Sequence, residues 1–208
     1  MRRPQPLCYF LLILMLPAYL AAGDYWPLVA GATFQYESAA LSWINYSLRD
    51  NPAGDGTTLR EGTSGPLPCS SSEAYFDDGS GDIYLPYATW QCLGDLEPTE
   101  YDFDPPLLFL DLPLAAGKTW TWNGDLNGSP SSVAFSVTGE QVITVASRTF
   151  TVMVVSVDEV SGIEWLPQEL YLHRDLGPVI WLEHNLVSWT ELVDTPPATW
   201  GQVKALYR

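Results

Sequence analysis

The chain has 208 residues, with 25 Asp and Glu against 9 Lys and Arg, so its formal net charge at pH 7 is −16. A surface this acidic repels nucleic acid and anionic lipid, which argues against binding to either class. Apolar residues make up 47% of the chain and charged residues only 16%, a composition that argues against a disordered protein.

The N-terminus has the pattern of a secretory signal peptide. Arg2 and Arg3 precede an apolar run from Leu7 to Leu20, and small residues follow at 21–23. The run is too short for a typical membrane span. We therefore expect residues 1–23 to be removed and the mature protein to be exported, periplasmic or extracellular, and not membrane-spanning. A retained helical anchor is the alternative.

A ten-residue pattern occurs twice in the mature chain. Residues 27–36, PLVAGATFQY, recur as residues 113–122, PLAAGKTWTW, with Pro, Leu, Ala, Gly and Thr at the same offsets and an aromatic-x-aromatic pair at the end. We expect each copy to begin a β unit, with Pro at a strand edge, Gly at a bend and the aromatic side chains in the core. Gly31 and Gly117 should then share one local conformation.

The first half of the chain predicts few regular strands. Strands are expected at Thr33–Tyr36 and at Leu41–Leu48, where Ile44, Tyr46 and Leu48 alternate with Trp43, Asn45 and Ser47. From residue 50 to about residue 107 the pattern is weak: a loop over 62–72, a short strand at 74–76, an edge strand at 83–93 and an acidic connection over 95–104. Cys69 and Cys92 lie in this region and are expected to form a disulfide, since paired cysteines are usual in exported proteins.

The second half predicts a β meander. Runs rich in β-branched and aromatic residues follow one another with tight turns between them, at 107–112, 132–137, 141–145, 149–157, 169–173, 179–183 and 186–193. The predicted fold is therefore all-β, a curved antiparallel meander or half-barrel with a short C-terminal helix. We expect one domain over 24–195, in two unequal halves, 24–110 and 111–195, followed by a tail at 196–208.

The tail combines apolar and basic residues. Thr199 can cap a short helix in which Trp200 and Leu206 lie roughly on one side, with Lys204 and Arg208 near its C-terminal end. Docking onto its own domain and recognition by another envelope component are the two interpretations of this segment.

The pattern around the first copy resembles that of a loose group of secreted bacterial proteins and lipoproteins of unknown function. Their leading motif is Pro-Leu-x-x-Gly-x-x-aromatic-x-aromatic, as in 27–36 here after Asp24-Tyr25-Trp26, with a second copy in mid-chain. A strand pair like 142–155 and a Gly-containing turn like 176–179 also belong to the resemblance, although Ser147-Arg148 replaces the usual Ala-Gly. The resemblance implies a half-barrel similar to envelope proteins that handle lipid or lipoprotein, and no catalytic residues.

Catalytic patterns are weak. His173 and His184 are the only histidines, and neither belongs to a GxSxG or HExxH motif, so we expect both to be structural. Four glutamates on the C-terminal strands could pair as in glycosidases, but a chain this acidic contains many such pairs by chance. They are Glu164, Glu169, Glu183 and Glu191.

An acidic turn offers a possible cation site and no other cofactor is predicted. Asp77, Asp78, Ser80 and Asp82 supply closely spaced oxygens of the kind that Ca²⁺ prefers, but their spacing is not that of an EF-hand. A solvated turn is the simpler interpretation.

Nine tryptophans are the strongest remaining signal. Core packing explains most of them, while a few exposed rings would suffice for a binding surface. Candidate ligand-binding residues are Trp120, Trp122, Trp165 and Trp181. We expect a non-catalytic exported protein that binds lipid, another apolar ligand or an envelope protein on an aromatic-lined curved sheet. The alternatives are a carbohydrate-acting hydrolase or carbohydrate-binding module, and a structural module of the envelope.

Overall fold

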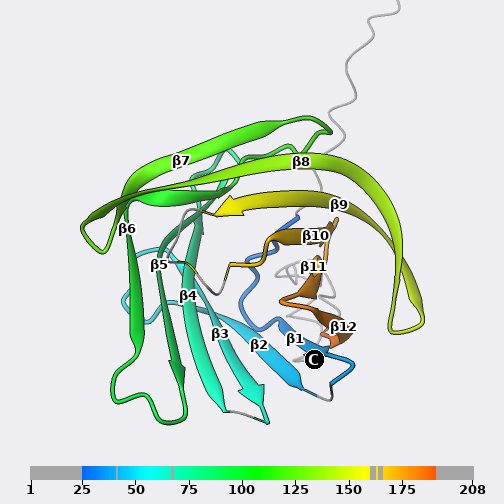
Figure 1. The fold of residues 1–208 in the computed structure, drawn as a ribbon, viewed down its shortest axis with the longest axis horizontal. Helices are drawn as coiled ribbons and strands as arrows, with labels where there is room; N and C mark the ends of the chain where they lie inside the picture. The colour runs from blue at the N-terminus through cyan, green and yellow to red at the C-terminus, as the bar shows by residue number, and fades with distance from the viewer. Residues whose placement is uncertain (1–24, 41, 67, 160–162, 164–165, 191–208) are drawn as a thin grey trace, which may run out of the picture.

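The computed structural model describes residues 25–40, 42–66, 68–159, 163 and 166–190, and within these ranges regular structure consists of strands (Figure 1). The strands are β1 (Thr33–Glu37), β2 (Trp43–Asp50), β3 (Thr58–Gly65), β4 (Cys69–Asp77), β5 (Ile83–Cys92), β6 (Thr99–Leu110), β7 (Thr119–Leu126), β8 (Ser129–Val145), β9 (Arg148–Glu159), β10 (Glu169–His173), β11 (Gly177–Trp181) and β12 (His184–Trp189). Among the described residues there is no helix with the length and apolar character needed to cross a membrane.

The twelve strands form a closed antiparallel barrel. Each strand pairs with its neighbours in sequence, and β12 returns to pair with β1, so the order around the barrel is that of a simple meander. The expectation of an all-β antiparallel fold is confirmed, but the half-barrel was wrong, because the β1–β12 pairing leaves no open edge. The predicted signal peptide and C-terminal helix lie outside the described residues.

The two copies of the repeated pattern have the same backbone hydrogen bonds. Gly31 N–H donates to the carbonyl of Leu48, and Gly117 N–H donates to the carbonyl of Val137. Leu48 and Val137 each donate back to the residue after that glycine, and both glycines have positive φ, 92° and 82°. The copies lead into β1 and β7, the first and seventh strands. The repeat is therefore structural around its glycines, as its sequence predicts. The prolines were wrongly expected at strand edges, because Pro27 and Pro113 lie outside the strands, in the segments that precede β1 and β7.

The middle of the first half is more regular than its sequence suggests. The predicted loop over 62–72 holds the end of β3 and the start of β4, and the predicted acidic connection holds the start of β6. Glycines replace the apolar residues that would show the alternation of β3 in the sequence. Gly62 and Gly65 are the direct partners of the aromatic residues Tyr46 and Trp43 of β2. Residues 132–145 likewise form part of one long strand, β8, with a bulge between Val137 and Gly139 in place of the expected turn.

The barrel interior is filled by side chains, many of them aromatic. Trp26, from the segment that precedes β1, is 3% exposed, and its ring lies 4.8 Å from that of Phe109, 5.2 Å from Tyr75 and 5.7 Å from Trp181. The cavity beside it, lined also by Arg60, measures about 20 Å³, enough for about one water molecule. Twelve strands can enclose a much larger space, so the N-terminal segment acts as part of the core.

The expected disulfide is confirmed. Cys69 begins β4, Cys92 ends β5, and the two residues are direct partners in the β4–β5 register. The bond closes a loop with a sequence separation of 23 residues. On the chain-entropy model, a loop of this length stabilises the folded state by roughly 3 kcal/mol.

Candidate functional site

The tryptophans predicted to bind ligand do not share one surface. Trp120 on β7 is stacked on Phe135 at 4.9 Å, and Trp181 on β11 is 1% exposed. Trp122 is also buried, although one edge reaches a surface groove, and Trp165 lies outside the described residues. The three described rings, those of Trp120, Trp122 and Trp181, therefore serve chiefly as core.

The carboxylates of the acidic turn accept hydrogen bonds from the protein itself. Asp77 Oδ1 accepts from the N–H groups of Gly79 and Gly81, and Asp78 Oδ1 accepts from the N–H and hydroxyl of Ser80. Asp82 accepts from the N–H of Leu112, 30 residues along the chain. Within the described residues no cluster of three or more His, Cys, Asp or Glu side chains is arranged to hold a metal ion.

One of the two histidines joins two turns. His184 Nδ1 lies 2.6 Å from the carbonyl oxygen of Leu182, which can only accept, so Nδ1 donates. In the neutral ring Nε2 then accepts from the hydroxyl of Ser42, 2.8 Å away, which in turn accepts from Ser38. A serine nucleophile and its base require such a bond, but neither Ser42 nor His184 lines the two grooves on the outer face of β12 and β1–β5. We interpret the network as a link between the β1–β2 and β11–β12 turns.

The other histidine packs edge-on against Phe150, with ring centroids 5.6 Å apart. Burial lowers the pKa of His173, and the nearby carboxylate of Asp175 opposes this only in part. Of the four candidate glutamates, Glu169 and Glu183 line one hollow beside β9–β11, and the other two lie outside the described residues.

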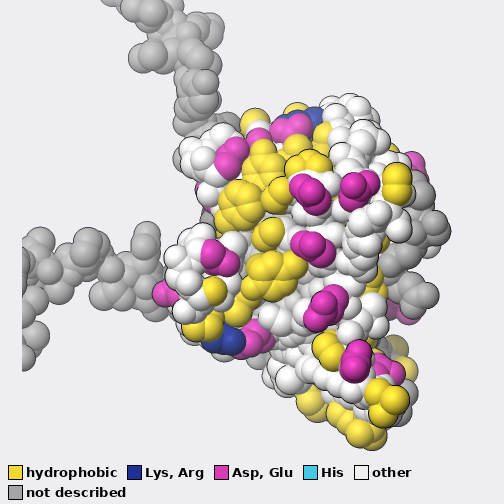
Figure 2. Space-filling model, turned by 90° about the vertical axis from the view of Figure 1, so that its left-hand side faces the viewer, with side chains coloured by type: hydrophobic (Ala, Val, Ile, Leu, Met, Phe, Trp, Pro, Cys, Tyr) yellow, Lys and Arg dark blue, Asp and Glu magenta, His cyan; other side chains and the backbone are white. Residues whose placement is uncertain are grey.

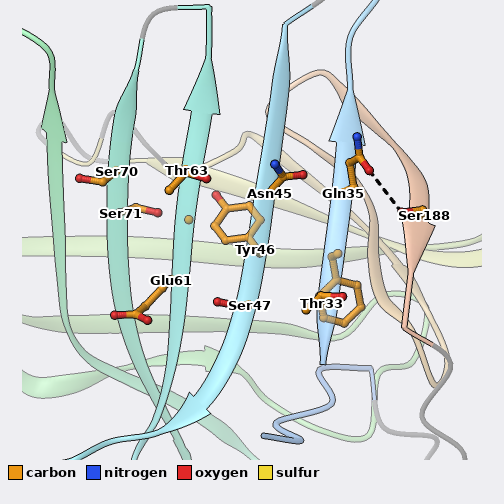
Figure 3. Close-up of a pocket in the computed structure, with 12 residues that line it drawn as sticks. Thr33, Gln35, Asn45, Tyr46, Ser47, Glu61, Thr63, Ser70, Ser71 and Ser188 are labelled. Carbon is orange, nitrogen blue, oxygen red and sulfur yellow. Dashed lines mark hydrogen bonds between the residues drawn. The ribbon is translucent and has the colours of Figure 1, made fainter. Parts of the chain in front are cut away.

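A row of uncharged polar side chains crosses six adjacent strands on the outside of the barrel. Its members are direct partners from one strand to the next, in the order Ser188, Gln35, Asn45, Thr63, Ser70 and Gln91, on β12, β1, β2, β3, β4 and β5. Figure 3 shows most of these side chains along neighbouring strands, with the bond from Ser188 to Gln35 dashed. Because strands lie ~4.8 Å apart, the row extends over about 24 Å.

The row lies in two adjoining grooves. The first has a volume of about 570 Å³, and the second, of about 460 Å³, shares Thr63 and Ser70 with it. Trp43 lines the second groove and is one of the few large hydrophobic side chains that are exposed, at 38%. A Cβ placed on Gly65 would lie 2.7–2.8 Å from atoms of the Trp43 ring. The ring therefore lies over the backbone of β3, where only glycine leaves room for it.

Among the described residues, one charged side chain lines the first groove, and it is already paired. Glu61 accepts two hydrogen bonds from Arg49, each 2.6 Å long, in a bidentate ion pair. The hydrogen bond from Arg49 is the main cause that lowers the pKa of Glu61. The groove thus offers hydroxyls and amides with little net charge, on a protein that is otherwise strongly acidic.

No family model, curated protein or solved structure matches this chain.

A second polar cluster is sealed inside the barrel. Arg60 Nη1 donates to Glu73 at 2.9 Å, and Tyr75 donates to the same carboxylate at 3.0 Å. The Arg60 guanidinium also lies 3.6 Å from the ring centroid of Tyr46 and 4.1 Å from that of Trp181. Burial opposes the charge on Arg60, but the Glu73 carboxylate and nearby tyrosines raise its pKa overall. With both charged side chains 4% exposed or less, the pair belongs to the core.

Sequence reasoning missed the polar row but not every sign of it. Serine, threonine, asparagine and glutamine are common on exposed strand faces, and only the register brings these six together. One signal was present: Trp43 stands on the polar side of the alternation that predicts β2. A tryptophan among Asn45 and Ser47 on a solvent-facing side indicates a binding surface more than a core.

Proposed function

We propose that this protein is a non-catalytic module that binds an extended, uncharged polysaccharide across the outer face of β12 and β1–β5. The observation that carries the proposal is the row of six hydroxyl and amide side chains, one on each strand, beside an exposed tryptophan. Each hexose presents several hydroxyls that both donate and accept, as do these side chains. The strand spacing is comparable with the length of one sugar unit, so successive units can meet successive strands.

The aromatic ring supplies the other usual element of sugar recognition. The Trp43 ring covers Gly65 with one face, which leaves the opposite side for an apolar face of a sugar ring. Its place beside the row, in the groove that also contains Ser70 and Gln91, allows stacking and hydrogen bonding to act on one ligand.

Electrostatics favour a neutral ligand over an anionic one. The formal net charge of −16 repels anionic polysaccharides, whereas the Arg49–Glu61 pair keeps the first groove nearly neutral. The second groove is lined by one carboxylate, Asp95, which accepts a hydrogen bond from the N–H of Cys92. A lipid or other apolar ligand held inside the barrel has less support, because Trp26 and its neighbours fill the interior beside a cavity of about 20 Å³.

The groove is built for binding more than for hydrolysis. Glycosidases need two carboxyl groups across the scissile bond, whereas the lining of the first groove contains one carboxylate, held by Arg49. The second groove is likewise lined by one carboxylate, Asp95, and the hydrolase alternative would need two carboxylates facing each other in one groove.

Affinity electrophoresis against a panel of neutral and anionic polysaccharides tests the proposal. We expect retardation by at least one neutral polysaccharide, at least tenfold weaker binding for Trp43→Ala, and weaker binding for Asn45→Ala. Tyr84→Ala, on another face of the barrel, is the matched aromatic control and should bind like the wild type. Equal retardation of the wild type and Trp43→Ala, or retardation by anionic polysaccharides only, would overturn the proposal.

A further inference from the structure

A separate groove lies on the side of the barrel where β4–β7 are found, away from the polar row. It measures about 490 Å³ and is lined by Phe76, Asp78, Tyr84, Pro105, Pro106, Leu108, Thr121, Trp122 and Asn123. Phe76 and Tyr84 are stacked with centroids 5.2 Å apart and planes at 12°. Trp122 is fixed by its indole N–H, which donates to the carbonyl of Pro105. The floor of the groove is therefore aromatic and proline-rich, and it is held rigidly.

Carboxylates surround this apolar floor. Figure 2 shows hydrophobic side chains in a band with acidic side chains along it, on the side of the molecule that includes β6. Partial burial is the largest cause that raises the pKa of Tyr84, and the negative charges of Asp78 and Asp82 raise it further. Both carboxylates therefore lie near Tyr84, which lines the groove. An occupant that is apolar and positively charged would match this surface.

Basic side chains in the described part of the chain are already engaged. Arg49, Arg60 and Lys118 form ion pairs with Glu61, Glu73 and Asp111. Arg148 and Arg174 lie over the aromatic rings of Trp189 and Tyr25. After the expected loss of the signal peptide, the remaining two cations in the sequence are Lys204 and Arg208.

We propose that residues 196–208 of this chain dock in the groove of β4–β7. The segment PPATWGQVKALYR carries two prolines, Trp200 and three other large apolar residues for the aromatic floor, and Lys204 and Arg208 for the carboxylates. Grooves of this kind, aromatic and bordered by acids, suit proline-containing basic peptides. The inference does not depend on polysaccharide binding, since the two surfaces share no residue.

The segment can reach the groove from the end of β12. The six Cα–Cα steps from Thr190 to Pro196 span up to about 20 Å when extended. The near side of the groove is β4, which lies four strands from β12 around the barrel, or about 19 Å at ~4.8 Å spacing. The same segment from a neighbouring molecule would meet the same groove, and the oligomeric state distinguishes these two routes.

A labelled synthetic peptide of residues 196–208 provides the test. It is titrated by fluorescence anisotropy onto the full chain carrying Lys204→Glu and Arg208→Glu, in which the resident segment no longer competes. We expect saturable binding that weakens with salt, binding at least tenfold weaker when Tyr84→Ala is added, and weaker binding with Asp78→Asn, which keeps an acceptor for the turn. Wild-type protein should bind less peptide than the double tail variant, because its groove is occupied.

The controls separate this groove from the polysaccharide face. Trp43→Ala in the same background should leave peptide binding unchanged, and a scrambled peptide should bind weakly. Equal affinity for chains with and without Tyr84→Ala, or no saturable binding to the tail variant, would overturn the proposal, whatever the outcome for polysaccharides.

Discussion

At two glycines of β3, an aromatic ring of β2 occupies the space that a side chain would fill. A Cβ on Gly62 would lie 2.5 Å from Tyr46 Cε1 and 2.5 Å from Ser71 Oγ, inside the barrel. A Cβ on Gly65 would meet the Trp43 ring on the outside. Aromatic coverage of a strand glycine offsets the weak packing of that residue, and here it also fixes the ring that we assign to sugar stacking.

The two glycines should therefore respond differently to alanine. We expect Gly65→Ala to displace the Trp43 ring and weaken polysaccharide binding severalfold, with a modest loss of stability because the ring is partly exposed. Gly62→Ala should destabilise the fold by roughly 2 kcal/mol, as overpacking of a core does, with little effect on the affinity of the folded protein. Denaturant unfolding and binding measured on both variants check this, and an unchanged affinity for Gly65→Ala would argue against the role of Trp43.

The buried ion pair gives a second prediction at the scale of residues. Arg60→Met leaves the Glu73 carboxylate buried without its cation, which should cost roughly 3–5 kcal/mol of the free energy of unfolding. The double variant Arg60→Met/Glu73→Leu should recover most of this loss. Urea unfolding of the three proteins measures both effects, and a cost below ~1 kcal/mol for Arg60→Met would show that the pair is not sealed from water.

At the scale of elements, the two copies of the repeated pattern give the turns before β1 and before β7 the same backbone conformation. Gly31 and Gly117 have φ of 92° and 82°, and a Cβ at either would meet no atom within 4 Å. Alanine should therefore cost only the backbone strain of positive φ, about 1 kcal/mol at each position. Thermal unfolding of Gly31→Ala and Gly117→Ala should give similar shifts. A difference of several kcal/mol between them would mean that the two turns are not equivalent.

The sequence predicts elements well where apolar residues alternate. β1, β2 and most of the C-terminal meander follow from that alternation. β3 and the first part of β4 were missed because glycine and serine occupy much of them, although the expected strand at 74–76 lies within β4. The first part of β6 was missed because Pro105, Pro106 and several acids obscure its pattern, while its end was expected at 107–112. Closure could not be predicted, since the partners Phe34 and Trp189 lie far apart in the sequence and no local signal pairs them.

The candidate site depends on the same long-range information. The alternation of β2 places Asn45 and Trp43 on the solvent side, but the partners of Asn45 come from β1 and β3, and Ser188 from the last strand. Strand register decides which common polar residues form a row, and register was not predictable for strands that were themselves missed.

At the scale of the whole molecule, buried tyrosines make the barrel sensitive to alkali. Burial is the main cause that raises the pKa of Tyr36 to about 12. Burial also raises the pKa values of Tyr46 and Tyr75 well above their usual range. The folded state thus favours the neutral phenol. Its contribution to stability is fully present below the unfolded pKa of about 10 and is lost as pH rises towards 12 and above.

We therefore expect stability to be nearly constant just below pH 10 and to fall steeply between about pH 10 and 12. For Tyr36 alone, the difference between 10 and about 12 corresponds to roughly 3 kcal/mol. Denaturant unfolding at a series of pH values measures the fall, and Tyr36→Phe should make it less steep. Tyrosinate absorbance that develops fully while the barrel stays folded would contradict the buried position of these side chains.

The whole barrel also sets how the polysaccharide would lie. The polar row crosses the strands, so a chain bound along it contacts β12, β1, β2, β3, β4 and β5 in turn, while the opposite side with β7–β9 stays free. Longer oligosaccharides should bind more tightly until their length matches the row of about 24 Å.

Amide chemical-shift mapping during titration with a neutral oligosaccharide tests the central claim most directly. We predict that the largest shifts occur at Gln35, Asn45, Thr63 and Ser70, together with the indole N–H of Trp43, and that β7–β9 remain unchanged. Shifts confined to other strands, or the absence of shifts with every neutral oligosaccharide that the electrophoresis panel contains, would contradict it.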